Sequence, residues 1–274
     1  MISCIILRPM SVGNLTLYTF AISHFSEKIR WTLDASGLKY TEVVMTPFLH
    51  LMPALLMGGR GETTLPILKC SPSGQGQAQH IQDSTAILRW LDEQLGPWPL
   101  MPPDRSLRED IMGIEDRFDA IGKDIARYLY LTGLERDDEV FDLWTGHASP
   151  GQIRLLRLAF PVVKWGFKRR LSITATAAAQ SELRIQQALA WLDGRISDGR
   201  LYLSGNQLSV ADITAASILS PLVCPVQHPL YGSESFRQRP WHPPTWLGER
   251  PGVAWVRRMY EAHRLPSVKQ QAVA

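Results

Sequence analysis

The sequence predicts an α/β domain followed by an all-α domain, and three observations support this division. Strand-like and helix-like stretches alternate through residues 1–96. Residues 97–104 are rich in proline, which cannot continue a helix. Beyond this segment, apolar residues recur with the period of about 3.6 that is typical of helices facing a core. We therefore expect two domains, 1–96 and 105–274, joined by a stiff linker.

The first domain begins with a strand, a helix and a second strand. Leu15–Phe20 alternates as a half-buried strand does, and a helical stretch follows from Ser26, with Gly37 as its stop signal. Tyr40–Met45 is rich in β-branched residues, which favours a strand. The stretch from Pro47 to Gly61 is rich in Leu, Met and Gly and has no clear period. We expect a helix there.

Two more strands and a helix complete the first domain. Thr64–Leu68 and Ala78–Ile81 have the composition of short strands, with the turn Ser71–Gly76 between them. In Ile87–Leu95 apolar residues recur every four positions, which indicates a helix that Gly96 ends. The predicted order is therefore β-α-β-α-β-β-α.

The second domain carries two apolar stripes with helical spacing. Leu107–Ile125 places apolar residues three and four positions apart, and a capping box begins at Ser106. Ile185–Ile196 repeats the stripe. A second capping box, Ser209-x-x-Asp212, is flanked by apolar residues that can form a hydrophobic staple. We assign this second box a structural role.

An insert at about 140–174 is the least usual part of the helical domain. Its basic residues are interspersed with apolar ones, a pattern that can place a helix on a membrane surface. The pattern also fits two helices, broken at Pro161, that pack over the domain with a solvated basic edge. We expect this second arrangement. The basic residues are Arg154, Arg157, Lys164, Lys168, Arg169 and Arg170.

Composition excludes several classes of function. The 29 Lys and Arg against 26 Asp and Glu give a net charge of +3, and no concentrated basic face of a nucleic-acid binder is indicated. Three cysteines without a CxxC motif exclude a disulfide scaffold and a Cys4 zinc site, and fit a reducing compartment. The seven histidines lack ligand spacing, so we expect no metal. With no signal peptide or spanning apolar run, we expect a cytoplasmic protein without membrane association.

Three short motifs of the first domain can each be explained as a cap or a strand start. Ser23 precedes the first helix, Leu65–Pro66 begins the third strand, and Asp83–Ser84 opens the last helix of the domain. Ser and Asp are common N-cap residues. The unpaired N–H groups and the dipole at a helix start also favour an anion. Taken alone, these residues are compatible with capping and with anion binding.

The three motifs together, with Leu208–Ile213 in the second domain, resemble the glutathione transferase superfamily. The resemblance covers residues 15–95 and the signature of the helical domain. It implies a thioredoxin-like N-terminal domain with a mixed sheet, and one glutathione groove formed by the three motifs. It also implies a homodimer, which is the usual state in the family.

The resemblance implies that Ser23 activates the glutathione thiol. A thiol with a pKa of about 8.5 is only a few per cent ionised at neutral pH, and a hydroxyl donor beside a helix start lowers that pKa. The tyrosine used by other classes of the family falls at Thr19. The two cysteines of the family's redox members fall at Ser23 and Ser26, which argues against thiol–disulfide reduction. Ser26 is the alternative contact to the sulfur.

The resemblance also implies where the rest of glutathione binds. Leu65–Pro66 corresponds to the family's cis-proline, where the Leu65 backbone can pair with the cysteinyl backbone. In Asp83–Ser84, the acid would meet the γ-glutamyl ammonium, while the serine and the helix N–H groups would receive the γ-glutamyl carboxylate. The glycyl carboxylate should lie near a cation, for which His50 and Arg60 are the candidates.

The function implied by the resemblance is that of a glutathione transferase-like enzyme. Glutathione would be the co-substrate, and the thiolate would attack an apolar electrophile or reduce a peroxide between the domains. One alternative is a non-catalytic protein that binds glutathione or another ligand. A glutathione-dependent thiol–disulfide reductase is a further alternative that the missing cysteines disfavour.

Overall fold

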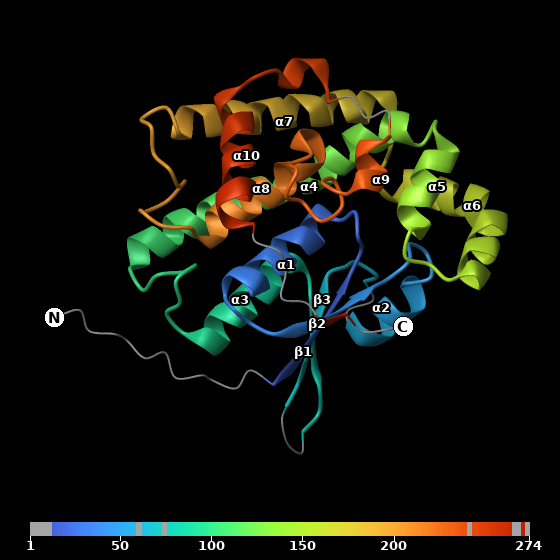
Figure 1. The fold of residues 1–274 in the computed structure, drawn as a ribbon, viewed down its shortest axis with the longest axis horizontal. Helices are drawn as coiled ribbons and strands as arrows, with labels where there is room; N and C mark the ends of the chain where they lie inside the picture. Colours follow the sequence, from blue (N-terminus) through green and yellow to red (C-terminus); the bar gives the residue numbers. More distant parts are fainter. Residues whose placement is uncertain (1–12, 59–61, 73–75, 240–242, 265–269, 272–274) are drawn as a thin grey trace.

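The computed structural model describes residues 13–58, 62–72, 76–239, 243–264 and 270–271. A mixed sheet of order β4-β3-β1-β2-β5 forms the base of the molecule, and a layer of helices covers it (Figure 1). The fold is the predicted thioredoxin-like domain followed by a helical domain. β1 (Asn14–Thr19) is central in the sheet.

β1 has β3 on one side and β2 on the other, and β4 and β5 form the two edges of the sheet. β1 runs parallel to β2 (Tyr40–Val44) and antiparallel to β3 (Ile67–Ser71). β3 in turn pairs antiparallel with β4 (Gln79–Gln82). One edge of the sheet, running across the strands, therefore brings together the end of β1, the start of β3 and the end of β4.

Helices cover both faces of this sheet, as the alternation along β1 requires. Leu17 packs into a core with α1 (His24–Ala35) and α3 (Ser84–Leu95). Tyr18 points the other way, into a small cluster with α2 (Leu51–Gly58). The stretch without a clear period is thus a short helix, as expected.

Two predicted boundaries are wrong. β3 begins at Ile67 and not at Thr64, because proline at position 66 has no N–H to donate to a strand partner. The long helix of the second domain is capped by Asp104, whose Oδ1 accepts from the Leu107 N–H at 2.8 Å, so Ser106 lies inside the helix.

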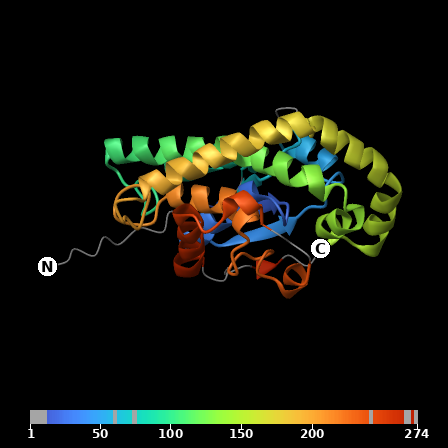
Figure 2. The ribbon, with the colours of Figure 1, turned by 90° about the horizontal axis from the view of Figure 1, so that it is seen from above.

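The helical domain is built around one buried helix. α8 (Val210–Val223) is buried at every position, and α4 (Arg105–Gly133) packs against it and against α7 (Ala175–Arg195). Figure 2 shows α4 and α7 running side by side across the molecule. α10 (Pro251–His263) packs on α8, and the shorter α9 (Glu234–Arg237) follows α8 in the chain. A 3₁₀ helix, η1, covers Thr245–Leu247.

The insert forms two helices with a small core of their own. α5 (Asp137–Thr145) and α6 (Pro150–Arg170) bury Trp144 and Val163 in a cluster separate from the main core. α6 continues through Pro161, so the predicted break is wrong. Apolar residues on both sides of the proline pack on the same cluster, and this packing keeps the helix continuous.

The two domains share one hydrophobic core, which runs from the sheet through α1 into α4 and α8. The chain also returns to the sheet after α10. β5 (Gln270–Gln271) pairs parallel with β2 at the sheet edge, a strand that the sequence analysis did not predict. Among the described residues, no helix is long and apolar enough to cross a bilayer.

Candidate functional site

Ser23 is the N-cap of α1. Its backbone is extended, and its Oγ accepts a hydrogen bond from the Ser26 N–H at 3.2 Å. This bond uses a lone pair of the oxygen, so the hydroxyl hydrogen is available to a ligand. The side chain is half-buried at the end of β1, where the first N–H groups of α1 also point outward. A sulfur anion placed here would meet a hydroxyl donor and the positive end of a helix.

Ser26 has different surroundings. Its side chain is fully buried, and its Oγ accepts a hydrogen bond from the Phe20 N–H at 3.3 Å. That bond closes the loop between β1 and α1. Both serine hydroxyls accept one backbone hydrogen bond, and the difference between them is burial: Ser23 is partly exposed to a ligand and Ser26 is not.

Leu65–Pro66 is joined by a cis peptide bond and lies beside the start of α3. The Pro66 carbonyl accepts from the Asp83 N–H at 3.2 Å. The Gln82 side chain donates from Nε2 to the Thr64 carbonyl at 2.8 Å, which fixes the segment before Leu65. The backbone N–H and C=O of Leu65 have no hydrogen-bond partner in the described parts of the chain.

Asp83 and Ser84 begin α3 but face different environments. Asp83 is exposed, has a φ of 88°, and caps the helix by accepting from the Ala86 N–H at 3.0 Å. Ser84 is buried, and its hydroxyl is engaged within the protein. It accepts from Lys28 Nζ at 3.2 Å and donates to Asp119 Oδ1 at 3.2 Å.

A buried polar cluster lies directly behind the start of α3. Lys28 of α1 is fully buried and forms ion pairs with Glu115 and, at 2.7 Å, with Asp119, both from α4. Thr85 Oγ1 donates to Glu115 Oε1 at 2.8 Å. Burial raises the pKa of Glu115 although Lys28 acts in the opposite direction. Two carboxylates thus face one ammonium group, and Asp119 remains partly exposed beside Ser84.

The sequence analysis missed this cluster. Its members come from three helices in two domains, and no spacing rule connects them. The position of Glu115 next to the apolar stripe of α4 is a weak signal at most, because charged residues often border such a stripe. The position of Asp119 makes it a candidate for contact with a cationic group of a ligand.

The two candidates for the glycyl end of glutathione differ in what the structure shows. The His50 ring meets the Phe20 ring edge to face, with centroids 4.5 Å apart. Burial lowers the pKa of His50 to about 4, so its ring is neutral at neutral pH. A role for His50 would thus be that of a neutral hydrogen-bonding group. Arg60 lies outside the described residues.

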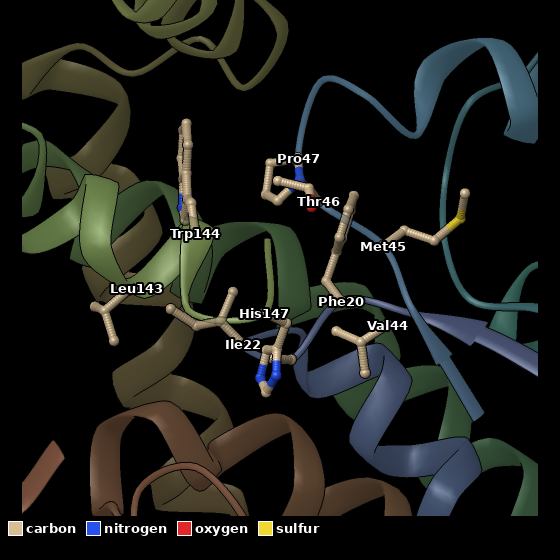
Figure 3. Close-up of a pocket in the computed structure, with 10 residues that line it drawn as sticks. Phe20, Ile22, Val44, Met45, Thr46, Pro47, Leu143, Trp144 and His147 are labelled. Atoms are coloured by element: carbon tan, nitrogen blue, oxygen red, sulfur yellow. The ribbon is translucent and has the colours of Figure 1, made fainter. Parts of the chain in front are cut away.

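A small hollow, with a cavity volume of about 10 Å³, lies next to the segment that precedes Ser23, where the N-terminal domain meets the insert (Figure 3). One wall is Phe20–Ile22, which precedes Ser23 directly, and a second is Val44–Pro47 after β2. Leu143, Trp144 and His147 from α5 and the following turn form the third wall. Most of these side chains are apolar, as is usual in sites for small organic ligands.

The polar groups of the hollow are few. Figure 3 shows the His147 imidazole beside Ile22, and the Thr46 side chain comes from the opposite wall. Within the described ranges, no group of three or more His, Cys, Asp and Glu side chains could hold a metal ion.

Comparison with known proteins identifies two family matches in the chain. Residues 17–98 match the glutathione S-transferase N-terminal domain, and residues 175–254 match the glutathione S-transferase C-terminal domain. Together the matches cover more than half of the chain. They leave out α4 and the insert, which lie between them. No curated protein matches the sequence.

Solved structures with the same fold cover almost the whole chain. A glutathione S-transferase from Methylobacterium radiotolerans, in complex with glutathione sulfonate, has a TM-score of 0.60 and 19% identity, and the match covers 96% of this chain and 98% of that one. A glutathione S-transferase from Methylobacillus flagellatus with bound glutathione has a TM-score of 0.59 and 15% identity, and the match covers 92% of this chain and 97% of that one. A maleylacetoacetate isomerase from Methylobacterium extorquens, with bound malonate and glutathione, has a TM-score of 0.53 and 16% identity, and the match covers 92% of this chain and 98% of that one. At these identities the similarity shows the fold.

Proposed function

The chain belongs to the glutathione S-transferase superfamily, and we therefore propose that it binds glutathione and joins it, through its sulfur, to an apolar electrophile. One observation carries the proposal. Ser23 follows β1, Leu65 precedes β3 and Asp83 follows β4, so the sheet topology brings all three motifs to one edge. An extended tripeptide laid along this edge can contact each motif in turn.

The start of α3 is the proposed site of the γ-glutamyl group. The Ser84 and Thr85 N–H groups are at the positive end of the helix and suit the carboxylate. Asp83 and Asp119 supply negative charge for the ammonium. The Ser84 hydroxyl already bonds Lys28 and Asp119, so its role in this proposal is to hold those two charges in place.

Ser23 is the proposed donor to the glutathione sulfur. Its hydroxyl hydrogen is available, and its position at the start of α1 adds the helix dipole to the stabilisation of a thiolate. The buried Ser26 supports the loop that holds Ser23. The Leu65 backbone would pair with the cysteinyl residue, and His50 or Arg60 would contact the glycyl end.

The hollow beside Ser23 is the proposed site of the electrophile. Its apolar walls favour an apolar second substrate, and His147 and Thr46 can meet one polar group on it. The chemistry would be attack of the thiolate on an electrophilic centre held next to Ser23. A peroxide is a second substrate class that the same thiolate could reduce. We also propose that the protein is a homodimer, as is usual in the family. A cytoplasmic location is proposed because a low number of cysteines is typical of proteins in a reducing compartment.

Two measurements test this function. Titration calorimetry of the purified protein with glutathione should show binding, and a panel of apolar electrophiles should be conjugated at a rate above the uncatalysed one. Binding without conjugation or peroxide reduction would support the alternative, a non-catalytic glutathione-binding protein. Absence of glutathione binding by a folded protein would contradict both.

A further inference from the structure

One face of α6 is apolar and exposed to solvent. Leu155, Leu158, Val162 and Trp165 have between 55% and 84% of their surface exposed. At 3.6 residues per turn these side chains lie within roughly 80° of one another. Leu156 points to the opposite side of the helix and is buried in the protein. α6 therefore presents apolar side chains on two faces, and the structure covers only one of them.

The charges of α6 all have one sign. The helix has no acidic residue. Arg157 and Lys164, at the flank of the exposed stripe, pair with Asp138 and Asp137 of α5. The remaining cations have no ion-pair partner in the part of the chain that the structure describes: Arg154, Lys168, Arg169 and Arg170.

Two of these cations, Arg154 and Arg169, lie where they can meet an anionic surface. Helical spacing places Arg154 and Arg169 on the same side as the exposed stripe, near its two ends. The Arg169 guanidinium lies over the Trp165 ring, 5.8 Å from its centroid. Long cationic side chains beside a tryptophan are typical of helices that lie at a membrane interface.

The position of α6 leaves this face open. Figures 1 and 2 show α6 at the outer edge of the molecule, away from the sheet. The exposed stripe is on a convex helix surface, so it does not form a groove for a peptide. A second copy of the chain fits poorly, because a two-fold contact would set this positive patch against itself.

We propose that α6 docks the protein on an anionic lipid surface. The stripe of Leu155, Leu158, Val162 and Trp165 enters the boundary between headgroups and acyl chains, and Arg154 and Arg169 contact lipid phosphates. α6 lies in the plane of the surface and does not cross it, which agrees with its charge content. This inference does not depend on the proposed glutathione chemistry.

Co-sedimentation with vesicles tests the proposal on the full chain. The protein should bind vesicles of phosphatidylglycerol mixed with phosphatidylcholine, bind phosphatidylcholine vesicles much more weakly, and dissociate as salt is raised. Leu158→Glu should lower partitioning to the anionic vesicles by about tenfold or more, because a buried leucine contact is lost and a carboxylate is repelled. Arg154→Gln combined with Arg169→Gln should lower it by roughly tenfold on anionic vesicles only.

A matched control distinguishes binding through α6 from nonspecific binding of exposed leucines to vesicles. Leu201 is 58% exposed in the segment between α7 and α8, and Figure 1 shows that segment at the end of the molecule opposite α6. Leu201→Glu should bind vesicles as the wild type does. Circular dichroism should show all variants folded, because every changed side chain is exposed. The proposal is overturned if the wild type ignores anionic vesicles, if Leu158→Glu still binds, or if Leu201→Glu loses binding equally. It is also overturned if Leu158→Glu dissociates a dimer in light scattering while vesicles are not bound.

Discussion

Ser23 and Ser26 lie one turn apart, yet their hydroxyl groups differ in their access to a ligand. Each accepts one backbone hydrogen bond, but Ser23 is partly exposed at the start of α1, whereas Ser26 is fully buried and holds the Phe20 N–H. The difference leads to opposite expectations for the two alanine variants, one on thiol chemistry and one on stability.

Ser23→Ala should raise the pKa of the thiol of bound glutathione by about 1–2 units, because the sulfur loses a charge-assisted hydrogen bond of about 1.5–3 kcal/mol. Glutathione affinity should change much less, since the contacts at Asp83 and Leu65 remain. Turnover at neutral pH should fall and partly recover at higher pH, where the thiol ionises without help. Thiolate absorbance, titrated against pH, measures the shift.

Ser26→Ala is the comparison variant for this experiment. It should lower the melting temperature, because the Phe20 N–H loses its partner, at a cost of about 1–3 kcal/mol. It should leave the thiol titration where it is in the wild type. If Ser26→Ala shifts the titration and Ser23→Ala does not, Ser26 is the contact to the sulfur.

Asp83→Ala should weaken glutathione binding by about 1.5–3 kcal/mol, roughly tenfold or more, through loss of a charge-assisted contact. Calorimetry on the folded variant measures it. Asp104→Ala is a matched control, because Asp104 is also an exposed aspartate that caps a helix, at the start of α4. Both variants lose a cap, and only Asp83→Ala should lose affinity. Equal affinities would mean that Asp83 is a cap alone.

His24 should make the stability of the protein depend on pH. Burial lowers the pKa of His24 to about 4, from 6.5 in the unfolded chain, although Asp119 acts in the opposite direction. Between these values the unfolded state binds more protons, so the free energy of unfolding should fall as the pH drops from about 6.5 to 4. The slope from this group is about 1.4 kcal/mol per pH unit.

Denaturant unfolding at several pH values checks this slope. His24→Gln should flatten it, while the contribution of His50, whose pKa is also about 4, remains. A wild-type slope that survives intact in His24→Gln would contradict the assignment.

At the scale of elements, α8 depends on its capping box. Asp212 accepts hydrogen bonds from the Ser209 N–H at 2.9 Å, from the Ser209 hydroxyl at 2.7 Å and from the Leu203 N–H at 2.7 Å. All of these atoms are buried, so the box holds both the start of α8 and the loop before it. The site of the proposed glutathione contacts lies on other elements.

Ser209→Ala and Asp212→Ala should therefore lower the melting temperature and leave glutathione affinity nearly unchanged. The loss of a cap costs about 0.5–2 kcal/mol, and Asp212→Ala should be at the upper end because it leaves buried donors unpaired. Ser149→Ala is the control, since Ser149 forms a similar box with Gln152 on the exposed start of α6 and should matter less. Thermal unfolding and calorimetry give both readouts. Normal melting without glutathione binding would contradict the structural role.

At the scale of the whole molecule, a buried ion-pair network connects the end of α10 to α1. The Arg264 Nε donates to Glu27 Oε1 at 2.7 Å, and its Nη1 donates to Asp34 Oδ2 at 2.8 Å. Burial alone would raise the pKa of Glu27, but Arg264 and other cations hold it at about 2. The C-terminal end of the helical domain is thus connected to the helix that carries Ser23.

Arg264→Met should destabilise the protein by about 3–5 kcal/mol, because the buried Glu27 loses its main partner. In the wild type, Glu27 stabilises the fold above pH 4.5, and this contribution is lost as the pH falls toward 2. The acid-induced drop in unfolding free energy should therefore be smaller in Arg264→Met. Thermal and acid unfolding measure both effects.

Two further variants check the mechanism of this prediction. Adding Glu27→Gln to Arg264→Met should restore part of the stability, since the fully buried carboxylate that lost its main partner is then removed. Arg105→Met, which removes an exposed pair with Glu109, should leave the melting temperature nearly unchanged. A large effect of Arg105→Met, or no rescue by Glu27→Gln, would contradict the explanation.

Features that depend on near neighbours in the chain could be predicted from the sequence. Alternation along β1, the caps at Ser23 and Asp83 and the box at Ser209 each involve residues within a few positions, so spacing and residue type predict them. The motif resemblance added the fold class and the shared groove. Two boundaries moved because another local feature acted, the proline at position 66 and the cap at Asp104.

The tertiary structure alone decided the contacts between remote segments. The cluster of Lys28 with Glu115 and Asp119, the connection from Arg264 to Glu27, and the wall that α5 adds beside Ser23 join residues from different elements and domains. Packing also kept α6 continuous through Pro161, against local preference, and left its second apolar face uncovered. Such contacts arise because burial forces charges into pairs and apolar faces into contact wherever the folded chain brings them together, a condition that no local pattern encodes.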